Sequence, residues 1–257
     1  MPDTRQPPGA LEILCAMTSQ SRLTLFLSVA IAAALTACGS PKLLIEANQH
    51  NLRQARTVAT AFYHEHGQRA GLEDIPFVTV GMEAGPGFSY DVQHNVLFVT
   101  PAEYADFDTQ KFFNRASLEG TGASAYNSLV FEYFTAHQMM HLLYDELPVH
   151  AASHWDEEMH INTMTWLFLR RSGLAEGKEA AWLTTLANLE GELGRRYPNA
   201  AADANLVPDL RVDDNASYWF VTASSLQQSY RAAMGYETEG EYITELLMPA
   251  DEAQAAR

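Results

Sequence analysis

The sequence has few cysteines, few basic residues and no apolar run long enough to cross a membrane. Two cysteines in 257 residues exclude a disulfide-rich scaffold. Only 16 Lys and Arg side chains stand against 32 Asp and Glu side chains. The resulting formal charge of −16 argues against a nucleic-acid-binding function, because the mean field of the protein would repel a phosphate backbone. Hydrophobic residues make up 47% of the chain, as in globular proteins, so we expect a large core.

The N-terminal region has the pattern of a secretory signal. Residues 23–37 form an uncharged apolar run of 15 residues, whereas a membrane-spanning helix needs roughly 20. Arg22 precedes this run, and Met17 lies a few residues before Arg22. A positive flank followed by a short apolar run is typical of a signal peptide. We therefore expect translation to start at Met17, and residues 1–37 to comprise an upstream extension and a signal peptide.

The end of the apolar run resembles the lipobox of bacterial lipoproteins. Residues 35–40 read Leu-Thr-Ala-Cys-Gly-Ser. The resemblance implies cleavage before Cys38 and acylation of this cysteine, which would anchor the mature chain in the bacterial cell envelope. Gly39 in place of an aspartate implies the periplasmic face of the outer membrane, where the cell has one. We expect the mature chain, residues 38–257, to form a single domain.

Hydrophobic patterning predicts a few strands followed by helices. β-rich segments bounded by proline, glycine or polar residues lie at residues 77–80, 88–90 and 95–100, and we expect them to form a small antiparallel sheet or hairpin. Strands followed by helices are typical of an α+β fold. Apolar residues recur every three or four positions in the predicted helices, which span residues 41–66, 124–144, 153–171, 180–195, 216–234 and 239–247.

Metal-ligand residue types are concentrated in one stretch of the chain. Five of the nine histidines fall within 24 residues, from His137 to His160. His137 and His141 are four residues apart in a predicted helix, so their imidazoles share one face and could reach a single ion. Zinc at such a pair needs a third protein ligand. The next predicted helix offers Glu158 as the first candidate, followed by Glu157, His154 and His160.

These residues resemble the motif of the zincin metallopeptidases, His-Glu-x-x-His. The similarity is greatest to gluzincin-type metallopeptidases of unassigned function, in which Leu-Pro and an acidic Glu-x-x-x-Asp helix follow the motif. In this chain residues 137–141 read His-Gln-Met-Met-His, residues 147–148 read Leu-Pro, and residues 158–162 read Glu-Met-His-Ile-Asn. The resembling stretch covers about a third of the chain.

The resemblance implies a zincin-like α+β domain with a zinc ion held by His137, His141 and Glu158. Asn162 stands where an aspartate orients a ligand histidine. Members of this family place an edge strand beside the cleft and pair the substrate backbone with it, which implies that a peptide or protein would bind in the cleft.

Two departures from the family pattern affect catalysis. Gln138 stands where the family has its catalytic glutamate, which takes a proton from water and passes it to the leaving amine. An amide cannot do this, and the loss of a positioned general base typically costs on the order of 10²–10⁴ in rate. Asn162 in place of aspartate weakens the support for a ligand histidine. We therefore expect zinc binding with impaired or absent peptidase activity.

Two other hypotheses stay open at the level of sequence. The chain could be an active zinc hydrolase that uses another base, for which Glu157 and Glu132 are the nearest candidates. It could also be a metal-free envelope scaffold or adaptor, in which His137 and His141 are core histidines. Ring nitrogens of both histidines converging within about 4 Å of a Glu158 oxygen would favour the metal site, and divergent side chains would favour the scaffold.

Overall fold

The structure, a computed structural model, describes residues 45–81, 87–118, 120–195 and 215–248. The chain divides into two compact units, Met1–Ala47 and Asn48–Arg257, and all elements discussed below belong to the second unit. The predicted signal segment and Cys38 lie outside the described residues. No helix within the described ranges is both long and apolar enough to cross a membrane.

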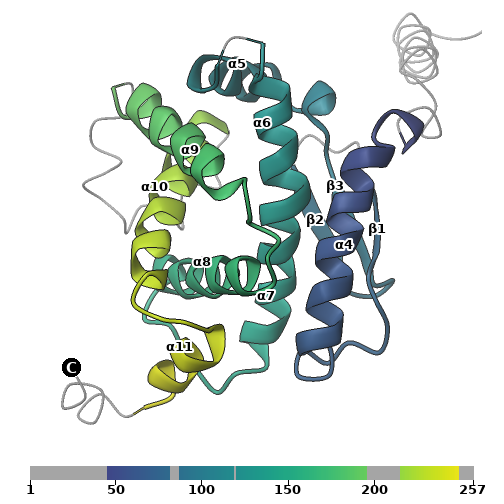
Figure 1. Cartoon of the computed structure of the whole chain (residues 1–257), viewed down its shortest axis with the longest axis vertical. Coiled ribbons are helices and arrows are strands. Elements are labelled where there is room, and N and C mark those ends of the chain that lie inside the picture. Colours follow the sequence, from purple (N-terminus) through teal and green to yellow (C-terminus); the bar gives the residue numbers. More distant parts are fainter. Residues whose placement is uncertain (1–44, 82–86, 119, 196–214, 249–257) are drawn as a thin grey trace, which may run out of the picture. The chain divides into compact units, whose positions relative to one another are not determined.

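The fold is α+β, with one small sheet and a larger helical part (Figure 1). The sheet has the order β1–β3–β2. β2 and β3 form the predicted antiparallel hairpin, whereas β1 runs parallel to β3 and so departs from the expected antiparallel sheet. β3 lies between the other two strands, so β1 and β2 do not pair with each other. The strands span Phe77–Val80 (β1), Phe88–Asp91 (β2) and Val96–Val99 (β3).

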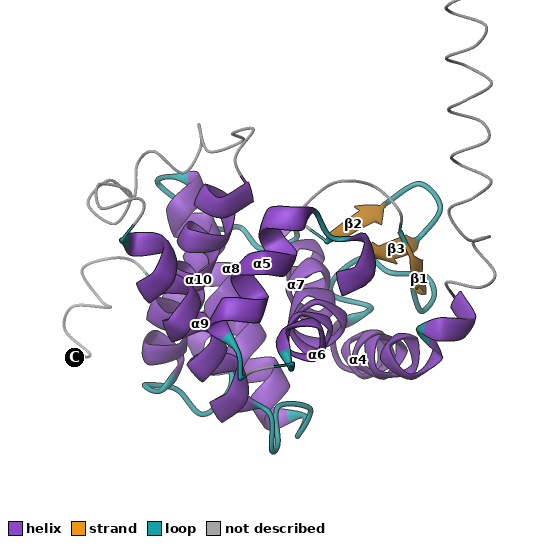
Figure 2. Ribbon diagram, turned by 90° about the horizontal axis from the view of Figure 1, so that it is seen from above, coloured by secondary structure: helices purple, strands orange, loops and turns teal. Residues whose placement is uncertain are grey.

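β3 occupies the centre of the sheet because it is apolar on the face that the helices cover. Leu97 and Val99 are fully buried, as is Val78, which lies opposite Leu97 in β1. Side chains two residues apart in a strand share one face, so these residues form a continuous apolar surface. The helices α4 and α7 pack against this sheet (Figure 2).

α4 (Gln49–His66) covers the β1 end of the sheet. Its buried positions Leu52, Ala55 and Phe62 recur at helical spacing, as the sequence predicted. Arg56 on the same helix donates hydrogen bonds to the carbonyl oxygen of Val78. This contact covers part of the outer edge of β1.

A single helical rod carries the histidine motif. It consists of α6 (Gly122–Ser128), a π-helical segment (Leu129–Phe134) and α7 (Thr135–Asp145). The sequence predicted one helix over residues 124–144, and the structure confirms it apart from two extra residues at the start, one at the end and the π-helical segment. All six residues of that segment are buried. π-helical turns are rare and often lie at functional sites, and this one ends three residues before His137.

Four further helices form the rest of the domain, and their bounds agree with the predicted ones to within one residue. α8 packs against α7, α10 and α11, and α10 packs against α9. Aromatic side chains help to hold this part together: Trp166 is fully buried and its indole Nε1 donates to the carbonyl oxygen of Leu226. The helices span His154–Arg171 (α8), Glu179–Gly194 (α9), Asn215–Ala233 (α10) and Glu239–Leu246 (α11).

One helix, α5 (Phe107–Ala116), was not predicted from the sequence. The signal was present: the Asp106 side chain caps the helix by accepting a hydrogen bond from the Thr109 backbone N–H. Phe112 and Phe113 then bury one face. A cap followed by apolar residues at helical spacing would have identified it.

Candidate metal centre

His137 and His141 face each other across one turn of α7. Their Nε2 atoms lie 3.1 Å apart, and their rings are nearly perpendicular, with centroids 4.7 Å apart. The helix carries them on one face because residues four apart lie one above the other. Phe88 of β2 and Phe134 of the preceding turn pack edge-on against the His137 ring and fix its position.

Glu158 approaches both histidines from the neighbouring helix. α8 begins at His154, after Ser153 accepts a hydrogen bond from the backbone N–H of Asp156 and so caps the helix. This start places Glu158 one turn into α8, opposite the histidines. Its Oε2 lies 3.6 Å from His137 Nε2, and its Oε1 lies 3.5 Å from His141 Nε2.

The two imidazole nitrogens and the Glu158 carboxylate form a triangle of the size that one metal ion requires. Two atoms bound at 2.0–2.1 Å with a tetrahedral angle between them lie about 3.3–3.4 Å apart. The two nitrogens are 3.1 Å apart and lie 3.5 and 3.6 Å from different oxygens of the carboxylate. One ligand atom from each of the three residues lies within 4.8 Å of the other two. His137, His141 and Glu158 can therefore hold a metal ion together. The predicted convergence of these three side chains is confirmed.

The surroundings keep both imidazoles neutral, which is the form that binds metal. Burial lowers the pKa of His137 to about 4, although the neighbouring Asn162 side chain acts in the opposite direction. Burial also lowers the pKa of His141 to about 4, and the nearby His137 adds to this effect. A neutral imidazole leaves a nitrogen lone pair free for a metal ion.

Asn162, to which the resemblance assigns the support of a ligand histidine, lies on α8 one turn after Glu158. It is buried, and its Oδ1 accepts a hydrogen bond from the Tyr133 hydroxyl at 3.1 Å. His137 Nδ1 is buried and has no hydrogen-bond partner among the described residues. An orphaned nitrogen on the far side of a ligand imidazole is where metal sites usually have an acceptor. Among the described residues, no acceptor therefore supports His137 from its Nδ1 side.

The residues considered as a general base, Gln138, Glu132 and Glu157, are not part of the triangle. Gln138, in the place of the catalytic glutamate, is partly exposed on α7. Glu132 is buried in the π-helical segment, where Lys178 pairs with its carboxylate and Ser128 donates to it at 3.0 Å. Glu157 does not belong to the group of converging ligand atoms. Among the described residues, that group consists of Glu158 and the two histidines.

Two more side chains stand near the triangle. His154 Nε2 lies 3.9 Å from Glu158 Oε1, and half of the His154 side chain is exposed. Tyr218 of α10 has a pKa raised first by burial and then by the charge of Glu158. It lies 60 residues beyond Glu158, so no local spacing could reveal this interaction.

His160, the remaining alternative ligand, points elsewhere. Its Nδ1 lies 2.8 Å from the hydroxyl of Tyr242 in α11, and its ring stacks on Tyr144. It therefore joins α8 to α7 and α11 and is not part of the triangle.

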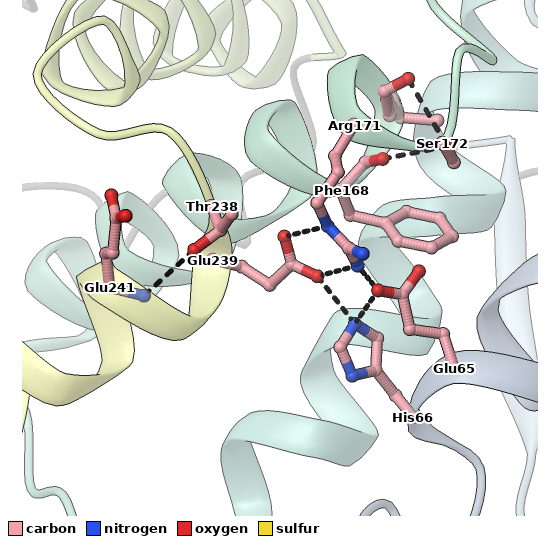
Figure 3. Close-up of polar contacts among 9 residues, drawn as sticks. Glu65, His66, Phe168, Arg171, Ser172, Thr238, Glu239 and Glu241 are labelled. Carbon is pink, nitrogen blue, oxygen red and sulfur yellow. Dashed lines mark hydrogen bonds and ion pairs between the residues drawn. The ribbon is translucent and has the colours of Figure 1, made fainter.

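A second group of metal-ligand residue types, at the other end of α8, was not predicted from the sequence. Figure 3 shows Glu65 and His66 from the end of α4, Arg171 from the end of α8, and Glu239 from the start of α11. His66 Nε2 lies 2.9 Å from Glu239 Oε1, and Arg171 pairs with both carboxylates. The guanidinium takes the position that an ion would need, so this group is an ion-pair network that holds three helices together. Its members are up to 174 residues apart, which removes any local signal.

Comparison with family models, curated proteins and solved structures gives no match to this chain. The resemblance to zincin metallopeptidases therefore rests on the motif residues and on the geometry described above.

Proposed function

We propose that this chain is a lipid-anchored envelope protein of zincin-like ancestry that binds zinc but has lost efficient peptidase activity. The single observation that carries the proposal is the triangle formed by His137 Nε2, His141 Nε2 and the Glu158 carboxylate. Two nitrogens and one oxygen are a common ligand set of zinc sites. The anchor is the acylated Cys38 that the lipobox resemblance implies.

Gln138 is the reason that we propose binding rather than hydrolysis. When bound, zinc would supply Lewis-acid chemistry at this site. Peptide hydrolysis also needs a base that removes a proton from water, and an amide next to His137 cannot do so. Neither alternative base belongs to the converging group: Glu132 is paired with Lys178, and Glu157 lies outside the set of mutually close ligand atoms.

A zinc titration of the full chain in competition with a chromophoric chelator tests the proposal. We expect one equivalent of zinc to bind to the wild type. The His141→Ala variant should lose this binding, and His94→Ala, a matched change at a histidine on the β2–β3 turn with a 72% exposed side chain, should retain it. Absence of zinc binding by the wild type, or equal binding by His141→Ala, would overturn the proposal.

The same fold supports the binding of an extended peptide beside the metal centre. Among the described residues β2 pairs only with β3, so its outer edge is open to a further strand. Phe88 of β2 contacts His137, which sets this edge next to the triangle. Beyond Tyr90, a groove of about 790 Å³ opens between the hairpin, the loop that leads into β1 and the end of α7.

Hydrogen exchange measured with unfolded casein as the probe tests this second role. We expect casein to slow amide exchange in β2 while the casein remains uncleaved over hours. Rapid, chelator-sensitive cleavage of casein by the wild type would instead support the active hydrolase, and unchanged exchange in β2 would exclude pairing at this edge.

A further inference from the structure

We propose that His154 is a fourth ligand of the metal centre. α7 and α8 would then each supply two ligands spaced four residues apart: His137 and His141 from one helix, His154 and Glu158 from the other. This inference deepens the proposed function and rests on it, because it needs an ion at the triangle.

The position of His154 in α8 gives it access to the triangle. It is the first residue of the helix, and Glu158 follows four residues later on the same face. His154 Nε2 already lies 3.9 Å from Glu158 Oε1, close to the separation of about 3.3–3.4 Å expected for two ligands of one ion.

The His154 side chain is free to complete the approach. It does not belong to the set of mutually close ligand atoms formed by His137, His141 and Glu158, so its ring must turn inward to bind. Half of the side chain is exposed, and no hydrogen bond to a described residue holds it in place. The backbone at this point is fixed, because Ser153 caps α8.

A fourth protein ligand changes what the site can do. Zinc sites with four protein ligands are closed and structural, whereas catalytic sites keep one position open. With His154 bound, the centre would have three nitrogens and one oxygen and no position for a substrate. This agrees with Gln138: a site that holds its ion without reacting needs no general base. The ion would then join α7 to α8, and peptide binding would depend on β2 alone.

Cobalt substitution in the full chain tests the fourth ligand without relying on activity. Cobalt bound to four ligands absorbs visible light more strongly than cobalt bound to five or six, so its spectrum reports the geometry. We expect the wild type to give the four-ligand spectrum and azide to leave it unchanged. In His154→Ala the affinity for cobalt and for zinc should fall about tenfold or more, and azide should change the spectrum. His150→Ala, at an exposed histidine of the preceding loop, should behave as the wild type.

Two results would overturn the inference while the proposed function stands: equal metal affinity of His154→Ala and the wild type, or a wild-type cobalt spectrum that azide changes. Either would show that the fourth position is open. A wild type that binds neither cobalt nor zinc would overturn the proposed function and the inference together.

Discussion

The Nε2 atoms of His137 and His141 lie 3.1 Å apart, and the Glu158 carboxylate spans both of them at 3.5–3.6 Å. Three polar side chains in this arrangement contribute little to stability by themselves, because the lowered pKa of each histidine removes the positive charge that could attract Glu158. A metal ion supplies the missing charge. The predictions below follow from this relationship and from the helices that hold it.

Zinc should stabilise the folded chain through the triangle. At a free zinc concentration of 100 times the dissociation constant, a ligand of the folded state adds about 2.7 kcal/mol to the free energy of unfolding. We expect the melting temperature to rise with zinc and to return to its starting value with a chelator. Calorimetric scans of the wild type and of Glu158→Gln check this. If zinc raises the melting temperature of Glu158→Gln as much as that of the wild type, zinc binds at another site.

Asn162→Asp should strengthen metal binding. A carboxylate at this position would accept a hydrogen bond from His137 Nδ1, the nitrogen that lacks a partner among the described residues. Acceptors of this kind typically change metal affinity by about 10–100-fold. We expect zinc affinity to rise about tenfold, measured by chelator competition. Asn162→Leu should lower the zinc affinity, because leucine offers no acceptor to His137. Leucine also removes the side-chain acceptor of the buried Tyr133 hydroxyl. An aspartate variant that binds zinc less tightly than the wild type would contradict the assigned role of Asn162.

Activity should return only when both departures from a catalytic site are reversed. Gln138→Glu restores the base, but His154 would still close the fourth position. We expect Gln138→Glu alone to stay inactive on casein. The double variant Gln138→Glu/His154→Ala should gain chelator-sensitive cleavage, on the order of 10²–10⁴ faster than His154→Ala alone. Full activity in the single variant Gln138→Glu would show that His154 does not block the site.

Glu239 should make stability depend on pH in the acid range. Burial would raise its pKa, but hydrogen bonds from His66 and Arg171 outweigh this and lower the pKa to about 2. A carboxylate whose pKa is lowered on folding contributes stability above its unfolded pKa, near 4.5, and loses the contribution as pH falls toward 2. The contribution at pH 7 is roughly 3 kcal/mol.

Denaturant unfolding of Glu239→Gln against the wild type measures this contribution. At neutral pH the free energy of unfolding of the variant should be lower than that of the wild type by roughly 3 kcal/mol. The difference should shrink below pH 4.5. Glu237→Gln, an exposed neighbour that precedes α11, is the matched control and should leave stability unchanged. A difference for Glu239→Gln that is the same at pH 3 and pH 7 would show that its charge is not the cause.

Sequence patterns predicted the parts of the site that lie within one helix or a short distance of it. The spacing of His137 and His141 sets their common face, because a helix repeats every 3.6 residues. Glu158 could be proposed because the loop between α7 and α8 is short, which brings the start of α8 back to the histidines. Asn162 was a candidate only through the resemblance, in which an aspartate at this position orients a ligand histidine.

Contacts between distant segments could not be predicted in this way. Tyr218 and Glu239 meet their partners only after α10 and α11 have packed on α8, and packing depends on the whole core. The parallel pairing of β1 with β3 has the same origin, since strand order depends on which strand is buried most. The π-helical segment follows no local pattern, because its residues are ordinary core residues of a helix.

Anomalous scattering at the zinc absorption edge, from crystals of the full chain grown with zinc, tests the central claim most directly. The account predicts one peak within 2.0–2.2 Å of His137 Nε2, His141 Nε2 and a Glu158 oxygen. A peak at another place, or no peak near these atoms with zinc in excess, would contradict it.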